Sequence, residues 1–239
     1  MRLYRYCLAA LLSVVLAPAA APTFAAFIAL TPNDSGAIRI EGGAFGSSAS
    51  HTQPLATIRG YQAAQAQFVD YASYLIFDTS SLAFTPTYGT LSFNASDSLA
   101  GLAGPGPLEL WGLDTHSPAA VLALPTGNIN AQLAQATSIA DDLRGGSSLA
   151  PDIIGPDGLI TFALNATALT QITGASGLFG VGLYDNRFGA LLGGIDVLST
   201  PQLYLSDEPV VQPVAAPAPL GLVLFALALL GLRRTRLAP

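Results

Sequence analysis

Acid–base residues gather at one point of the chain, in the run Asp114-Thr115-His116-Ser117. Ser, His and Asp are the residue types of a hydrolytic triad, in which the histidine takes a proton from the serine while the carboxylate orients the ring. A triad needs these groups to converge from separate rigid positions, and neighbours on one loop cannot pass a proton in that geometry. A turn whose Asp and Ser side chains bond the backbone accounts for the same residues, so we expect a turn.

Paired carboxylates offer two further kinds of chemistry. Asp141 with Asp142, or Glu109 with Asp114, could act as acid and base in a hydrolase, although adjacency in sequence does not set the required spacing across a bond. Carboxylates could also bind Ca²⁺, which takes six to eight oxygens from several segments. The runs with that potential are Asp141-Asp142, Asp185-Asn186 and Asp196. We expect solvated loop carboxylates and no cofactor, with one structural Ca²⁺ as the open alternative.

Trp111, the single tryptophan, could stack on a sugar ring. Side chains alternate between the two faces of a strand, so Leu108 and Leu110 would share one face and Glu109 and Trp111 the other. Trp111 is therefore either a core residue or a platform for a glycan. The chain contains no G-x-S-x-G, H-E-x-x-H or Walker motif, and the sequence predicts a non-enzymatic protein.

The charge distribution excludes other functions. The 239 residues have a formal net charge of -6, and all nine basic residues are Arg, which excludes lysine Schiff-base chemistry and the P-loop lysine. Between residues 27 and 208 there are four Arg against all fifteen acidic residues, so this body has a charge of 4 - 15 = -11. Nucleic acid is not an expected partner, because phosphate binding needs clustered basic residues.

Short apolar or alternating runs bounded by Gly, Pro, Asn and Asp recur through residues 26–208. They predict an all-β domain, an antiparallel β-sandwich of jelly-roll type with one or two short helices. The expected strands include residues 74–77, 90–93, 108–111, 159–164, 180–184 and 202–205. Helices are expected at 129–144, capped by Asn128, and at 166–173, between Asn165 and Gly174.

The first 25 residues have the pattern of a secretory signal peptide. Arg2 and Arg5 precede an apolar run, and small residues follow up to Ala25, where we expect cleavage. Cys7, the only cysteine, lies inside this segment, so the mature chain would contain neither disulfides nor thiolate metal sites.

The C-terminal end has three parts. A Pro/Ala-rich linker at 209–219 precedes an apolar helix with an Arg-rich end at 220–236, which predicts a membrane-spanning segment whose arginines stay cytoplasmic. This tail resembles the PEP-CTERM sorting signal, with Val214, Pro217 and Ala218 fitting a V-P-L-P-A variant. The sorting residues that the resemblance implies are Val214, Pro217, Ala218, Pro219, Arg233, Arg234 and Arg236.

Proteins with such tails are exported, held transiently in the inner membrane and processed by an exosortase, commonly in species that make exopolysaccharide. A plain C-terminal membrane anchor is the alternative. The run at 71–82 followed by 89–93 is similar to exported β-sandwich modules that accompany these tails and share an architecture with carbohydrate-binding modules. The resemblance implies a protein of the cell surface or extracellular matrix, associated with exopolysaccharide or biofilm; the alternative is a carbohydrate-binding module.

Overall fold

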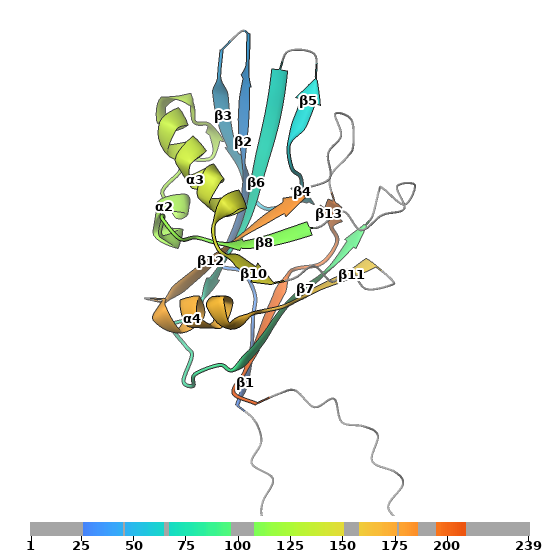
Figure 1. Ribbon diagram of the computed structural model, residues 1–239, viewed down its shortest axis with the longest axis vertical. Helices are drawn as coiled ribbons and strands as arrows, with labels where there is room; N and C mark the ends of the chain where they lie inside the picture. The colour runs from blue at the N-terminus through green and yellow to red at the C-terminus, as the bar shows by residue number, and fades with distance from the viewer. Residues whose placement is uncertain are drawn as a thin grey trace, which may run out of the picture. The chain divides into compact units, whose positions relative to one another are not determined.

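The fold was analysed in a computed structural model, which describes residues 26–208 except 45, 65–66, 97–107, 151–157, 176 and 186–194. Its strands form two antiparallel sheets (Figure 1). The first sheet, in the order β1-β14-β7-β13-β4 with β11 also pairing β7, contains β1 (Phe27–Leu30), β4 (Thr57–Ile58), β7 (Tyr88–Ser96), β11 (Leu159–Ala163), β13 (Ile195–Val197) and β14 (Gln202–Ser206).

The second sheet has the order β10-β8-β12-β6-β2-β3-β9, with β5 also pairing β6. Its strands are β2 (Asp34–Gly43), β3 (Ser48–Thr52), β5 (Gln62–Ala64), β6 (Gln67–Asp78), β8 (Leu108–Gly112), β9 (Gly127–Asn128), β10 (Ser148–Ala150) and β12 (Leu178–Asp185). All six predicted strands are confirmed, as is the mainly antiparallel two-sheet class.

The main core lies between the two sheets. On the first sheet, alternate residues of β7 and β11 such as Leu91, Phe93 and Phe162 point inward, and they meet Leu75 and Phe77 of β6 in the second sheet. All five are at most 2% exposed, which is the burial that drives folding through removal of apolar surface from water.

The helices are α2 (Pro118–Leu122), α3 (Leu133–Gly145) and α4 (Ala166–Gly174), and a 3₁₀ turn, η1 (Asn130–Gln132), precedes α3. The prediction for α4 is confirmed, since the Asn165 side chain accepts a hydrogen bond from the Ala168 amide at 3.0 Å. The predicted start of α3 is wrong. The Asn128 side chain accepts a hydrogen bond from the Asn130 amide at 3.0 Å and so holds the 3₁₀ turn. The α-helix begins after that turn, at Leu133.

Helices α2 and α3 cover the outer face of the second sheet, which makes a third layer (Figure 1). Ala136, Ile139, Ala140 and Leu143 of α3 form a second core with apolar residues of β2, β3 and β6. The contact with β12 is closest at Gly182, where a Cβ atom would lie 1.7 Å from the carbonyl oxygen of Leu143. A residue without a side chain is required there because the helix backbone occupies that space.

In the described part of the chain, no helix is long and apolar enough to cross a membrane. The predicted signal peptide at 1–25, the linker at 209–219 and the apolar helix at 220–236 lie outside the described residues.

Tyr74 carries a buried polar network inside the second core. Its hydroxyl lies 2.7 Å from Nε2 of His51 and accepts a hydrogen bond from Nε2 of Gln53 at 2.8 Å. Nδ1 of His51 faces the carbonyl oxygens of Leu124 and Pro125 at 3.2 and 3.1 Å, and a carbonyl can only accept. Nδ1 therefore carries a hydrogen, and in the neutral ring Nε2 is the acceptor facing the Tyr74 hydroxyl.

Burial raises the pKa of Tyr74 to about 12, against an ordinary value of about 10. The folded state thus favours the neutral phenol, and this contribution is complete below pH 10 and is lost as the pH rises from about 10 to about 12. We expect the wild type to lose roughly 2 to 3 kcal/mol more over that window than Tyr74→Phe. Urea unfolding of both proteins across the window measures this, and equal losses would contradict it.

Candidate functional site

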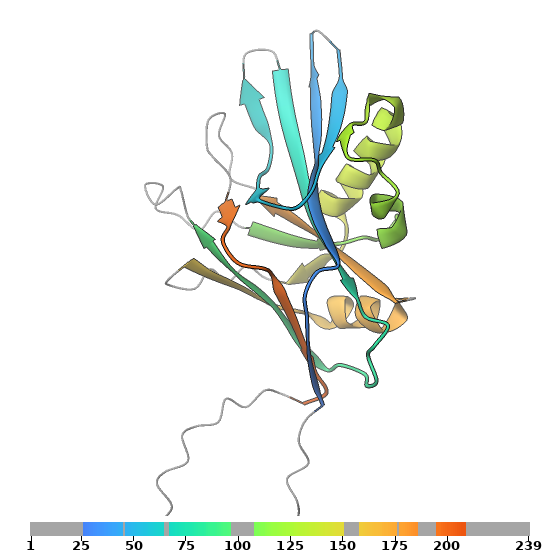
Figure 2. The ribbon, with the colours of Figure 1, turned by 180° about the vertical axis from the view of Figure 1, so that it is seen from behind.

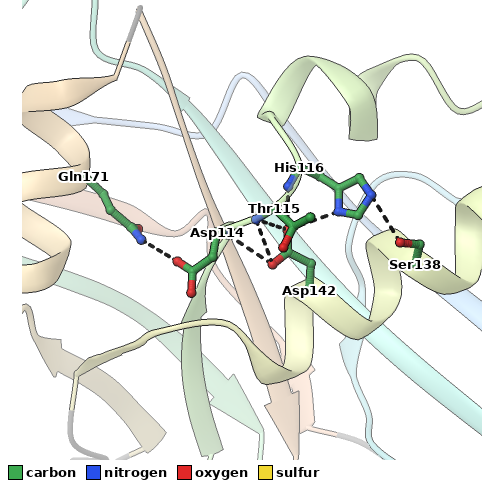
Figure 3. Close-up of polar contacts among 6 residues, drawn as sticks. All are labelled: Asp114, Thr115, His116, Ser138, Asp142 and Gln171. Carbon is green, nitrogen blue, oxygen red and sulfur yellow. Dashed lines mark hydrogen bonds and ion pairs between the residues drawn. The ribbon is translucent and has the colours of Figure 1, made fainter.

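One carboxylate organises the loop that contains the predicted turn. Asp142, on α3, accepts hydrogen bonds from three consecutive backbone amides: Asp114 at 3.1 Å, Thr115 at 3.0 Å and His116 at 2.7 Å (Figure 3). Its side chain is 5% exposed. The chain bends at residues 114–116, and the expectation that Asp114 and Ser117 hold a turn there is wrong, because a carboxylate from a distant helix accepts the backbone amides.

Asp142 also orients the imidazole of His116. Nδ1 of the ring lies 3.2 Å from Oδ2 of Asp142, and Nε2 lies 3.3 Å from the hydroxyl of Ser138 (Figure 3). This order of Ser, His and carboxylate is the connectivity of a hydrolytic triad. The serine and aspartate that complete it come from α3, and the loop contributes the histidine.

Ser138 and Asp142 stand four residues apart on α3 and therefore lie on the same side of the helix. That spacing was visible in the sequence within the predicted helix, and it is the one signal that could have identified the pair. The sequence could not predict that the loop with His116 contacts this helix, because the contact forms only in the tertiary fold.

The position of Ser138 opposes a nucleophilic role. It is the sixth residue of α3, where backbone amides already donate to carbonyl groups of the preceding turn. Hydrolysis through a serine requires donors aimed at the developing oxyanion, and the amides beside a nucleophile commonly supply them. The geometry therefore fits a structural fastening of the loop to α3 better than acyl transfer.

Asp114 ties the same loop to two other segments. Its carboxylate accepts from Nε2 of Gln171 on α4 at 2.9 Å and from the hydroxyl of Ser147 at 2.8 Å. A pocket of about 330 Å³ adjoins the loop, and its lining includes His116, Ser117, Gln171 and Phe179. The Glu109 carboxylate bonds a different partner, the indole of Trp111.

Trp111 lies on the less buried side of β8, as the alternation predicts. Leu108 and Leu110 are fully buried, while Glu109 and Trp111 are half-buried. The indole Nε1 of Trp111 donates to Oε2 of Glu109 at 3.1 Å. Trp111 is therefore not fully buried, and its interpretation as a glycan contact stays a prediction.

Asp141 and Asp142 do not converge on a shared point. Asp142 bonds the loop, whereas Asp141 is 58% exposed and pairs with Arg144, which also binds Asp70. Burial is the main influence on Asp70 and raises its pKa, although Arg144 acts in the opposite direction. Arg144 thus joins the end of α3 to β6.

The other described residues expected as cation ligands lie on different strands. Asp185 is buried at the end of β12, and Asp196 accepts a hydrogen bond from the Thr57 hydroxyl at 2.9 Å. Within the described ranges, no three His, Cys, Asp or Glu side chains lie close enough together to hold a metal ion. Asn186 and the predicted sorting residues from Val214 to Arg236 lie outside those ranges.

No model of a protein family matches this chain, and no curated protein matches it either.

Proposed function

We propose that this is a non-enzymatic exported protein of the cell surface or extracellular matrix, delivered through its C-terminal sorting segment. The proposal includes the jelly-roll-like form of the sandwich, a transient inner-membrane intermediate, an exosortase-type processing enzyme as partner, and association with exopolysaccharide or biofilm. In the sequence, the support for this proposal is the PEP-CTERM-like tail at residues 209–236.

The observation that carries the proposal is the position of the two ends of the folded body. Strand β1 pairs with β14, with Phe27 opposite Ser206, and the Asp207 amide donates to the Ala26 carbonyl at 3.2 Å (Figures 1 and 2). The segments assigned to export and to sorting therefore join the body at one place. Either segment can be cut without removing a strand, which is what an exported and processed domain needs.

Mass spectrometry of the protein recovered outside the cell tests the sorting step. We expect its last residue to lie near Pro217 to Pro219, with the peptide through Leu232 absent, because processing removes the helix. Replacing Arg233, Arg234 and Arg236 together with alanine is expected to reduce processing, since these charges hold the segment at the cytoplasmic face. An intact tail through Leu232 on the exported protein would instead favour the plain membrane anchor.

A second function, direct contact with surface polysaccharide, is favoured by the exposure of Trp111. Its ring is half-buried on the polar side of β8 beside Glu109, where a sugar could stack on it while bonding the carboxylate. The charge of the body favours an uncharged polysaccharide over an anionic one.

A further inference from the structure

The outer face of the first sheet differs from that of the second in having no covering layer. Helices α2 and α3 pack on the second sheet, on the side away from the first (Figure 1). In the described part of the chain, no helix packs on the outer face of β1, β14, β7 and β11. The described residues thus place no helical layer over this side of four paired strands.

The strand registers define which residues form this face. One row is Phe27, Ser206 and Tyr88; the next is Ala29, Tyr204, Thr90 and Ala163; a third is Gln202, Ser92 and Thr161; and Asn94 pairs with Leu159 beyond them. We call these twelve residues the open face; eleven of them are exposed or half-buried, and Ser206 is 2% exposed. The residues between them along each strand, such as Leu91 and Leu203, point into the core.

None of the twelve residues of the open face is charged. The body around this face has a formal charge of -11. Hydroxyl and amide side chains fill the middle rows instead. Acidic residues flank these rows: Asp196 of β13 lies past one end, and Asp207 and Glu208 follow β14 at the other end.

Aromatic rings gather at one end of the open face. Phe27 and Tyr204 stack with their centroids 5.8 Å apart, and Phe27 is 56% and Tyr88 47% exposed. Exposed aromatic rings beside hydroxyl and amide groups match a sugar chain, which offers apolar ring faces and hydroxyl groups that donate and accept. Trp111 offers only one ring, and its indole nitrogen is already bonded to Glu109.

We infer that the open face binds an uncharged polysaccharide. The inference rests on the second function above and places the contact on this sheet. An anionic polymer is disfavoured by the acidic body around the face, and a basic partner would find no carboxylate among the twelve residues. A neutral glycan meets neither obstacle.

Retention of the full chain on dextran and cellulose, with alginate as an anionic comparison, tests the inference. Thr90→Glu places a charge in the centre of the open face, and Tyr204→Ala removes a ring. Each is expected to weaken retention on a neutral glycan by about tenfold, which corresponds to about 1.4 kcal/mol for the loss of a ring contact or an uncompensated charge. Alginate is expected to retain neither the wild type nor the variants.

Thr170→Glu on exposed α4 is the matched control for added charge, and it is expected to bind as the wild type does. Both face variants should unfold in urea near the wild-type midpoint, because their side chains point outward. If Trp111→Ala lost binding while Thr90→Glu and Tyr204→Ala retained it, the open face would be excluded as the site, although the protein would still be a glycan binder. Failure of the wild type to bind either neutral glycan would overturn the inference, while tail processing would still be judged by mass spectrometry.

A second copy of the chain on the open face is the competing occupant. Sedimentation of the wild type as a dimer, with Thr90→Glu as a monomer, would assign the face to self-association and overturn the inference.

Discussion

Replacing Asp142 with alanine is expected to lower the free energy of unfolding by about 3 kcal/mol, because a hydrogen bond to a charged group contributes roughly 1.5 to 3 kcal/mol and Asp142 accepts several part-buried ones. Three backbone amides, those of residues 114 to 116, lose their acceptor in this variant, and His116 loses the group that orients its ring. For a domain of this size, the melting temperature should fall by about 6 to 12 °C. Urea unfolding followed by circular dichroism measures the change.

Asp141→Ala is the matched control, since it makes the same change one residue earlier at a side chain that is 58% exposed. An exposed ion pair contributes at most about 1 kcal/mol, so the control should stay close to the wild type. Equal destabilisation by the two substitutions would show that Asp142 does not fasten the loop in the way its contacts indicate.

The second large effect is expected at Gly182, where β12 meets α3. In Gly182→Ala, the added methyl group would lie 1.7 Å from the carbonyl oxygen of Leu143 and 2.6 Å from its carbonyl carbon. Backbone atoms cannot rotate away as a side chain can, so the helix must shift off the sheet. We expect a loss of about 2 to 4 kcal/mol in the free energy of unfolding, measured by urea unfolding.

Gly145→Ala provides the control for this substitution. Gly145 ends α3, and a Cβ atom built there has no neighbour within 4 Å. Alanine has the higher helix propensity, so the control should be unchanged or up to about 1 kcal/mol more stable. A wild-type stability for Gly182→Ala would mean that α3 packs farther from the sheet than described.

The fold class could be predicted because the apolar residues of β7, β8 and β11 alternate with polar ones, and this period is a property of the sequence. Helix α4 was equally accessible, since Asn165 and Gly174 mark its ends. Strand β3 was not: its sequence, Ser-Ala-Ser-His-Thr, is polar and small, yet His51 is fully buried. A buried histidine is tolerated there because Tyr74 and two carbonyl groups satisfy its ring nitrogens, and those partners are distant in sequence.

The candidate site was predictable only in part, for the same reason. A non-regular segment at 114–117 could be expected from its residue types, and the less buried side of Trp111 follows from strand alternation. The role of Asp142 depends on packing α3 against a loop 26 residues earlier in the chain. The local sequence pattern carries no information about that contact. Asp142 was therefore expected to be a solvated carboxylate like its neighbour Asp141.

The pairing of the first strand with the last has a consequence for how such a body can be reused. Because residues 27 and 206 are partners in one sheet, the folded unit enters and leaves a longer polypeptide through a single point. A unit of this kind can be inserted into a surface loop of another protein, or given new ends by circular permutation, with no rearrangement of its two cores.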